Sequence, residues 1–183
     1  MLAQFSYAGR WPFVPALLLA LISPPGTAAT LCQADEVVIF SCALRDSPRL
    51  ASVCASAGLT RVAGTLQFRL GTPGRAAEHV YPADPAGAQS LFYWQERRPY
   101  HSSLKEISFL SAGLVHTLSA LEGAAGMDGK TRGFQGGELL IEKTRGGEKL
   151  ARLACETYPD GTLDLAGIVN DAAGWRPDPA ARD

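Results

Sequence analysis

Apolar and polar residues alternate with a period of two along most of the chain beyond residue 30, the pattern of half-buried β-strands. The clearest case is 65–70, where Leu66, Phe68 and Leu70 share one face and polar residues occupy the other. Comparable patterns predict further strands at 37–44, 50–55, 78–81, 90–94, 104–110, 114–121, 138–143 and 149–155. We therefore expect an all-β fold, an antiparallel barrel or sandwich of about eight strands.

Two segments depart from this pattern. Residues 122–137 are rich in glycine and show no periodicity, which predicts a long loop. Near the C-terminus, Thr162 can cap a helix and Gly174 can end one. Between them, apolar residues recur at helical spacing at Leu165, Ile168, Val169 and Ala172. The pattern predicts one short C-terminal helix.

The first 29 residues have the layout of a secretory signal peptide. Arg10 precedes an apolar run at 11–22, and small residues follow it up to Ala29. We expect cleavage after Ala29, with Ala28 as the alternative. The apolar run is about a dozen residues, shorter than the roughly 20 that a membrane-spanning helix needs. The mature chain is expected to be periplasmic or secreted and not membrane-embedded.

This organisation predicts three parts of the chain. Residues 1–29 form the signal peptide, 30–174 form a single β domain and 175–183 form a loosely ordered tail with two prolines. Trp175 is placed to hold the start of that tail against the domain.

The four cysteines are expected to form disulfides, because an exported chain meets an oxidising compartment. Folding the chain about Pro48 places Cys42 opposite Cys54 on antiparallel strands, at a separation that a disulfide needs. The hairpin therefore predicts a Cys42–Cys54 bridge, and Cys32 and Cys155 are left to pair. No Cys-x-x-Cys pair is present, so a metal site is not expected.

Charge and composition exclude some partners. The chain has 17 basic and 18 acidic residues, a formal net charge of −1, without a basic stripe. It offers no electrostatic footprint for nucleic acid and no polybasic patch for a membrane surface. The expected partner is an envelope or secreted protein, no cofactor is indicated, and the oligomeric state is left open.

The residues most suited to recognition are Arg97, Arg98, Tyr100 and His101, in a polar loop after the aromatic strand 90–94. Arginine and tyrosine are the side chains that dominate interface hot spots. We treat these four residues as a candidate binding edge. The alternative is that the loop is a solvated connector.

No catalytic residue is assigned. His79, His101 and His116 lack the spacing of a metal site. His101 is followed by two serines, but catalytic triads are assembled from separate segments, and no Gly-x-Ser-x-Gly motif is present. We expect His79 to face solvent and His116 to be a partly buried histidine with satisfied hydrogen bonds.

Part of the chain resembles a family of small secreted, periplasmic bacterial proteins without an assigned activity. The matching stretches are 36–42, 51–56 and 66–71, with Tyr81-Pro82 shortly after. They span about the first third of the mature domain and carry no catalytic residue. The region from 105 to 135 departs from the aromatic, glycine-rich pattern of that family.

The overall character is also similar to periplasmic lysozyme inhibitors, which are small disulfide-linked β proteins that often act through a Ser-Gly-x-x-Tyr loop. The nearest stretch here, 111–114, lacks the adjacent glycine and the tyrosine.

The sequence favours an exported, non-catalytic binding or interaction module of the cell envelope. One alternative is an inhibitor of an envelope-attacking hydrolase such as lysozyme, which should present a protruding loop. The other is a small envelope hydrolase, which should show a cleft with a perturbed titratable group.

Overall fold

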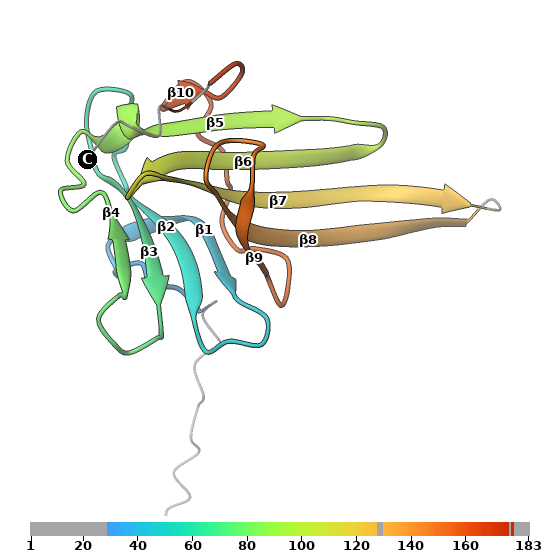
Figure 1. Ribbon diagram of the computed structural model, residues 1–183, viewed down its shortest axis with the longest axis horizontal. Helices are drawn as coiled ribbons and strands as arrows, with labels where there is room; N and C mark the ends of the chain where they lie inside the picture. The colour runs from blue at the N-terminus through green and yellow to red at the C-terminus, as the bar shows by residue number, and fades with distance from the viewer. Residues whose placement is uncertain (1–28, 128–129, 176, 178–183) are drawn as a thin grey trace, which may run out of the picture.

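The chain folds into two β-sheets packed face to face, shown by a computed structural model that describes residues 29–127, 130–175 and 177 (Figure 1). The predicted signal peptide and most of the predicted tail lie outside the described residues. The strands form two sheets, linked at one corner by an isolated bridge between Leu44 and Cys155, so the sandwich is the correct alternative and the described chain does not close a barrel. None of the helical segments in the described part of the chain could span a lipid bilayer.

The first sheet has the order β1-β2-β3-β4 and the second has the order β10-β5-β6-β7-β8-β9. All neighbouring strands are antiparallel except β10 and β5. A short 3₁₀ helix, η1 (Ala88–Leu91), precedes β5. The strands are β1 (Glu36–Ala43), β2 (Leu50–Ser56), β3 (Leu66–Gly71), β4 (His79–Tyr81), β5 (Phe92–Arg97), β6 (Ser102–Ser111), β7 (Leu114–Met127), β8 (Lys130–Glu142), β9 (Lys149–Ala154) and β10 (Asn170–Asp171).

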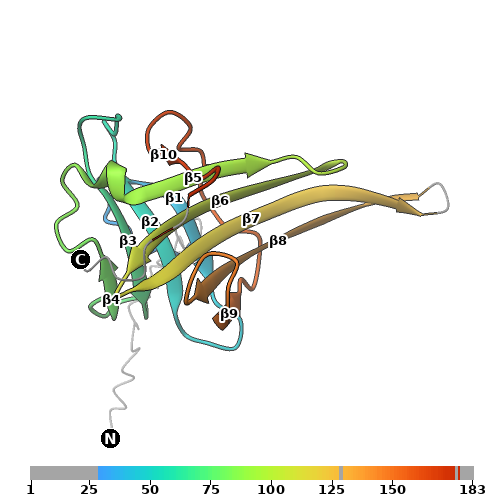
Figure 2. The same ribbon diagram turned by 45° about the horizontal axis from the view of Figure 1, so that its top comes forward.

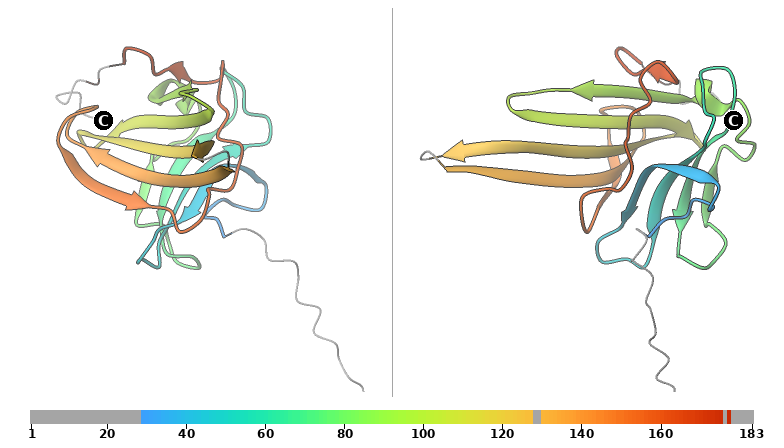
Figure 3. Two further views of the ribbon diagram at one scale, coloured as in Figure 1. Left: turned by 90° about the vertical axis from the view of Figure 1, so that its right-hand side faces the viewer. Right: turned by 180° about the vertical axis from the view of Figure 1, so that it is seen from behind.

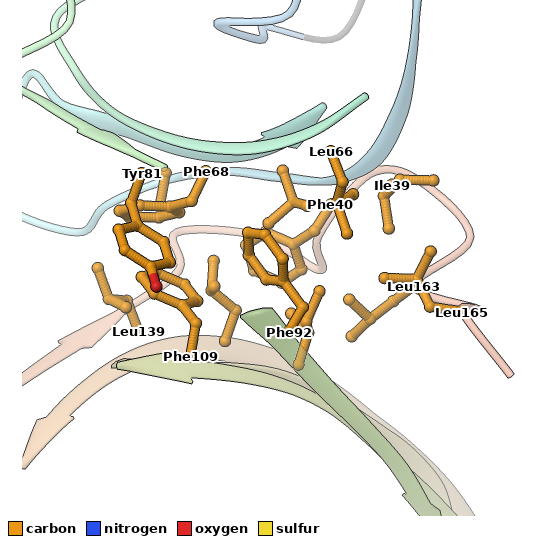
Figure 4. Close-up of a cluster of buried hydrophobic side chains, with 14 of the residues drawn as sticks. Ile39, Phe40, Leu66, Phe68, Tyr81, Phe92, Phe109, Leu139, Leu163 and Leu165 are labelled. Atoms are coloured by element: carbon orange, nitrogen blue, oxygen red, sulfur yellow. The ribbon is translucent and has the colours of Figure 1, made fainter. Parts of the chain in front are cut away.

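An aromatic cluster fills the space between the sheets (Figure 4). Phe109 of β6 lies at its centre and is fully buried. Its ring centroid is 5.0 Å from those of Phe68 and Tyr81 in the first sheet. In its own sheet the ring is 5.3 Å from Phe92 and 5.1 Å from His116. Burial of each large apolar side chain stabilises the fold by about 1.5–3 kcal/mol, and aromatic pairs add about 0.5–1.5 kcal/mol.

The alternation in β5 behaves as its sequence indicates. Phe92 and Trp94 face the core, whereas Tyr93 faces the opposite side of the sheet. There Tyr93 stacks on Trp175, with the ring centroids 4.0 Å apart. Trp175 therefore holds the segment after β10 against the second sheet, as predicted.

The predicted loop at 122–137 is wrong. β7 and β8 pair without interruption from Val115 and Glu142 to Met127 and Lys130. Because glycine has no side chain, this stretch lacks the alternation of apolar and polar residues that predicts a strand. The backbone hydrogen bonds between paired strands form without side chains.

The continued pairing extends β5–β8 beyond the first sheet (Figures 1 and 2). We call this projecting part, residues 95–106 and the described residues of 120–138, the arm. The first sheet does not cover the described residues of the arm. The segment after β9 lies against its inner face near the base, where Lys105 donates to the Thr162 carbonyl oxygen and a Cβ at Gly137 would lie 2.3 Å from Pro159.

The predicted C-terminal helix is also wrong. Residues 163–169 contain a single turn, in which the Ile168 N–H donates to the Leu165 carbonyl oxygen at 3.0 Å. Leu163 and Gly167 have φ values of 38° and 72°, in the left-handed region that a right-handed helix cannot include. The segment then enters β10. Most apolar residues of this segment point into the core although the backbone is irregular. The buried ones are Leu163, Leu165, Val169 and Ala172.

The predicted disulfide pairing is wrong, although all four cysteines are bonded. The bridges are Cys32–Cys54 and Cys42–Cys155, with Cα separations of 5.3 and 5.6 Å. The first ties the N-terminal segment to β2. The second ties β1 of the first sheet to the end of β9 in the second.

The register of the β1–β2 hairpin explains this error. Cys42 lies opposite Ala51, whereas Cys54 lies opposite Val38. The turn is centred before Pro48, because Asp46 adopts the left-handed conformation with φ of 57°. The observed register therefore differs from the one expected for a turn at Pro48: Cys42 lies opposite a residue three positions before Cys54.

A half-buried ion pair holds the N-terminal segment on the first sheet. The Arg69 guanidinium donates to both carboxylate oxygens of Glu36, at 2.6 and 2.7 Å, and to the Leu31 carbonyl oxygen at 3.0 Å. Burial alone would raise the pKa of Glu36, but hydrogen bonds from Arg69 and the Gln33 N–H lower it overall.

Peptide mapping of the oxidised protein is expected to recover the Cys32–Cys54 and Cys42–Cys155 pairs. The Cys42→Ser/Cys155→Ser variant should lose about 4–5 kcal/mol of unfolding free energy, and Cys32→Ser/Cys54→Ser about 3 kcal/mol, because the longer loop restricts the unfolded chain more. Denaturant titration measures both. A Cys42–Cys54 peptide in the map would contradict the register of the first hairpin.

Arg69→Ala is expected to lower the unfolding free energy by about 3 kcal/mol at pH 7, since it leaves the Glu36 carboxylate poorly solvated and unpaired. The matched control is Arg98→Ala, which removes an exposed arginine paired with Glu96 and should leave the unfolding free energy nearly unchanged, because solvent screens an exposed pair. Because the pKa of Glu36 is lowered on folding, the contribution of the pair is present at neutral pH and declines as the pH falls below 4.5. Equal losses in both variants would contradict this role for Arg69.

Candidate functional site

The arm carries a groove of about 500 Å³ on its outer face, the side of the second sheet turned away from the first sheet. Leu104, Leu121 and Gly136 form its floor. These residues are direct neighbours in register on β6, β7 and β8, so their side chains point to the same face. A Cβ at Gly136 would have no heavy atom within 4 Å, so this part of the floor is open.

Two ion pairs border the floor. Arg97 of β5 donates to Glu106 of β6 at 3.0 Å, and Arg152 of β9 donates to Glu138 of β8. Each pair joins two strands, so it holds the sheet together while placing both charges beside the groove. The site therefore has an apolar floor and a rim that presents both positively and negatively charged side chains.

The segment after β9 closes the groove at the base of the arm. It lines the groove with 155–158, and Arg45 lies beside it because the Arg45 N–H donates to the Ala154 carbonyl oxygen at 2.8 Å. Burial raises the pKa of Tyr158, with smaller contributions from the charge of the Glu122 carboxylate and from the hydrogen bond to it, so the Tyr158 hydroxyl is engaged by Glu122.

A second hollow of about 480 Å³ lies nearer the tip, with His101, Gly123 and Phe134 among its lining residues. Gly123 and Phe134 are opposite each other on β7 and β8. A Cβ at Gly123 would lie 2.6 Å from the Phe134 ring and 2.6 Å from the Ser102 Cβ, so only glycine lets these groups approach. The Phe134 side chain remains 39% exposed.

The four predicted binding residues lie in or beside the turn between β5 and β6, but they do not form one site. Arg97 lines the groove and His101 lines the second hollow, and His101 shares a further hollow of about 400 Å³ with Arg98. Tyr100 is 94% exposed and contacts the His101 ring edge-to-face at 5.7 Å. Arg98 instead makes two hydrogen bonds to Glu96, which lower the pKa of that carboxyl together with a hydrogen bond from Ser103.

Sequence reasoning missed most of the groove. Five of its contributors or neighbours were not singled out: Leu104, Leu121, Phe134, Gly136 and Arg152. The usable signal was the alternation within 104–106 and 138–140, where polar and apolar residues share one face. Beyond those stretches the glycines of β7 and β8 gave no pattern to extend.

The two histidines of the core lie away from the groove. His116 is buried, its ring stacks on His79 at 5.5 Å, and its Nδ1 lies 3.2 Å from the Leu114 carbonyl oxygen. This agrees with the predicted satisfied, partly buried histidine. His79 was expected in solvent, but it is half-buried, with Nε2 3.4 Å from the Ser111 hydroxyl. Burial lowers the pKa of His116 to about 4.

One group of metal-ligating side chains lies close together in the described part of the chain, namely Cys32, Glu36 and Cys54. The two sulfur atoms are bonded to each other, so neither is available as a thiolate ligand. The Glu36 carboxylate is held by Arg69. This cluster is therefore explained by the disulfide and the ion pair.

Comparison with protein-family models, with curated proteins and with solved structures gives no match for this chain.

Acidification is expected to destabilise the protein through His116. In the unfolded chain its pKa returns to about 6.5, so between pH 6.5 and about 4 the unfolded state binds a proton that the native state does not. Lowering the pH from 7 to 4.5 should therefore remove about 2–3 kcal/mol of unfolding free energy.

Denaturant titration of the protein and of His116→Phe at both pH values measures this effect. The variant retains an aromatic ring against Phe109 but cannot titrate, so its pH dependence should be smaller by that amount. His101→Gln, at an exposed histidine, is the control and should keep the full dependence. An unchanged pH dependence in His116→Phe would contradict the assignment.

Proposed function

We propose that this protein is an exported, non-catalytic binding module of the cell envelope that engages a protein partner through the arm. The observation that carries the proposal is the arm itself, a stretch of four strands that projects beyond the sandwich (Figures 1 and 2). Two disulfides accord with an oxidising compartment outside the cytosol. The N-terminal signal segment supports the same location.

The needs of the hydrophobic core do not account for the length of these strands. β7 has 14 residues and β8 has 13, whereas strands usually have about 5–6. The fully buried side chains of these two strands, Val115, Leu118 and Leu139, all lie in the half near the first sheet. A projecting half that adds little to the core is a surface available for recognition.

The groove has the composition of an interface. Its centre is apolar, formed by Leu104 and Leu121, and its rim is polar, formed by the Arg97–Glu106 and Arg152–Glu138 pairs. Protein interfaces show the same arrangement of an apolar centre within a polar rim. A partner side chain that covers the floor would bury apolar surface, and the carboxylates of Glu106 and Glu138 would keep their arginine partners.

An inhibitor of an envelope-attacking hydrolase such as lysozyme is the second candidate. The projecting arm is the protruding element that such an inhibitor needs, and Tyr100 at the β5–β6 turn is 94% exposed. The stretch 111–114, which we compared with the inhibitory loop, instead forms the turn between β6 and β7 at the opposite end of these strands. An inhibitor would therefore act through the arm and not through that turn.

A capture experiment tests the proposed function. The oxidised protein, recovered after export of the full chain, is immobilised and exposed to envelope extract and to a panel of lysozymes. We expect one protein to be retained in proportion to the bait. Changing Arg97, Tyr100 and Phe134 together to alanine should weaken its binding by about 30-fold, the effect of losing about 2 kcal/mol at a hot spot.

The matched control is Val62→Ala, an 88% exposed apolar residue in a loop of the first sheet. It should leave retention unchanged. Retention that survives the arm variant would keep the binding module but remove the arm as its site. If no protein is retained, the proposed function is wrong. Loss of lysozyme activity in solution, reversed by the arm variant, would select the inhibitor.

A further inference from the structure

β8 has a free edge along the arm. β9 pairs with β8 only between Glu138 and Glu142, whereas β8 continues to Lys130 with β7 on its other side. Among the described residues no other strand pairs with β8. Figure 1 and the right-hand view of Figure 3 show this outer edge of the β7–β8 hairpin without a neighbouring strand.

The backbone groups of this edge point outwards in a regular series. The Gly137 carbonyl oxygen accepts a hydrogen bond from the Cys155 N–H at 2.8 Å, on the side away from β7. Alternate residues of a strand direct both backbone groups to the same side. Gly133 and Gln135 therefore present their N–H and C=O groups along the free edge, in line with β9.

The edge lacks most of the devices that block strand addition. Proteins protect exposed edges with prolines, bulges or covering segments. Residues 130–138 contain no proline, and their pairing with β7 has no bulge. A Cβ at Gly136 would meet no heavy atom within 4 Å, and one at Gly133 would meet its nearest at 3.9 Å. An incoming backbone would therefore find space beside Gly133 and Gly136, whereas Pro159 closes the strand at Gly137, where a Cβ would lie 2.3 Å from its ring.

We propose that residues 132–136 of β8 bind an extended, acidic polypeptide segment, which joins the second sheet as an additional strand in line with β9. This inference rests on the proposed binding function and names its mode and the chemistry of its partner. The spacing of this row of backbone donors and acceptors matches that of another extended strand, which can replace solvent as their partner.

Charge selects the partner. Residues 132–136 carry one charged side chain, that of the exposed Arg132, and no acidic residue. Two copies of this edge would bring like charges together, which disfavours edge-to-edge dimers. A segment with acidic side chains would instead complement the edge and associate faster at low salt.

The groove gives the added strand its side-chain contacts. Its lining reaches the edge at 135–137, where β9 ends. The lining includes Arg45 and Arg152, and also Glu156 and Glu138, of which Glu138 pairs with Arg152. Side chains of an added strand alternate between the two faces of the sheet. One that lies opposite Gly136 would therefore point to the outer face and enter the groove beside Arg152.

The test uses the oxidised protein recovered after export of the full chain and a fluorescent, end-blocked peptide of sequence TVEVTVEVT. Fluorescence anisotropy should show saturable binding at least tenfold tighter than for TVKVTVKVT. Methylation of alternate backbone nitrogens in the peptide should abolish binding, because it removes donors without changing the side chains.

Gln135→Pro removes an edge N–H that makes no hydrogen bond to β7, so the strand should persist while peptide binding falls at least tenfold. Gln135→Ala is the matched control, which keeps that N–H and should bind within about twofold of the unaltered protein. Arg132→Glu should reverse the preference between the two peptides. Equal near-ultraviolet circular dichroism of the variants shows that each is folded.

Absence of peptide binding, or equal binding to Gln135→Pro and Gln135→Ala, would overturn the proposed mode. A dimer seen by analytical ultracentrifugation and lost in Gln135→Pro would assign the edge to a second copy and would also overturn it. The proposed function fails separately, when the capture experiment retains no protein. A captured partner that still binds Gln135→Pro would keep the function and reject strand addition.

Discussion

The structure depends on one contact between its two sheets, the packing of Phe109 against Phe68 and Tyr81. Phe109 lies on β6, and the two residues that it meets lie on β3 and β4. Because aromatic burial is the largest apolar contribution in this core, it fixes which half of the second sheet is covered by the first. The other half of β5–β8 then has no opposing sheet and forms the arm.

The segment that follows β9 completes this arrangement. The Cys42–Cys155 disulfide joins it to β1, and an Asp160–Ser41 bridge continues the contact. Gly161 passes so close to the first sheet that a Cβ there would lie 2.5 Å from the Ile39 carbonyl oxygen. Figure 3 shows the segment running past both sheets to β10. It also forms one end of the groove, so the element that clamps the sandwich also shapes the candidate site.

The arm combines two properties that a packed sheet does not offer together. Its outer face carries an apolar floor between ion pairs, and its β8 edge carries unpaired backbone groups. Glycines are central to both. Gly136 leaves the floor open, and Gly123 lets the Phe134 ring lie across β7. The cost of glycine in a strand is lost side-chain packing, which is acceptable where no second sheet is present to pack against.

Local patterning determined the strands of this protein wherever side chains alternate, because one face of each strand must be buried. The alternation of Leu66, Phe68 and Leu70 predicted β3, and the same signal placed the aromatic residues of β5. The oxidised state of the cysteines also followed from the sequence. Arg97 was singled out by its chemistry, and the structure places it at the groove; its role in recognition stays a prediction.

Only the tertiary structure decided the disulfide partners, the length of the strands that form the arm, and the irregular path of residues 163–172. The partners of Cys42 and Cys54 depend on a turn at Asp46, and a shift of three residues changes every cross-strand neighbour. The glycine-rich parts of β7 and β8 are strands because backbone ladders hold them, which side-chain periodicity does not report. The helical spacing at 165–172 is produced by burial against two sheets, since a core accepts any backbone path that delivers apolar side chains to it.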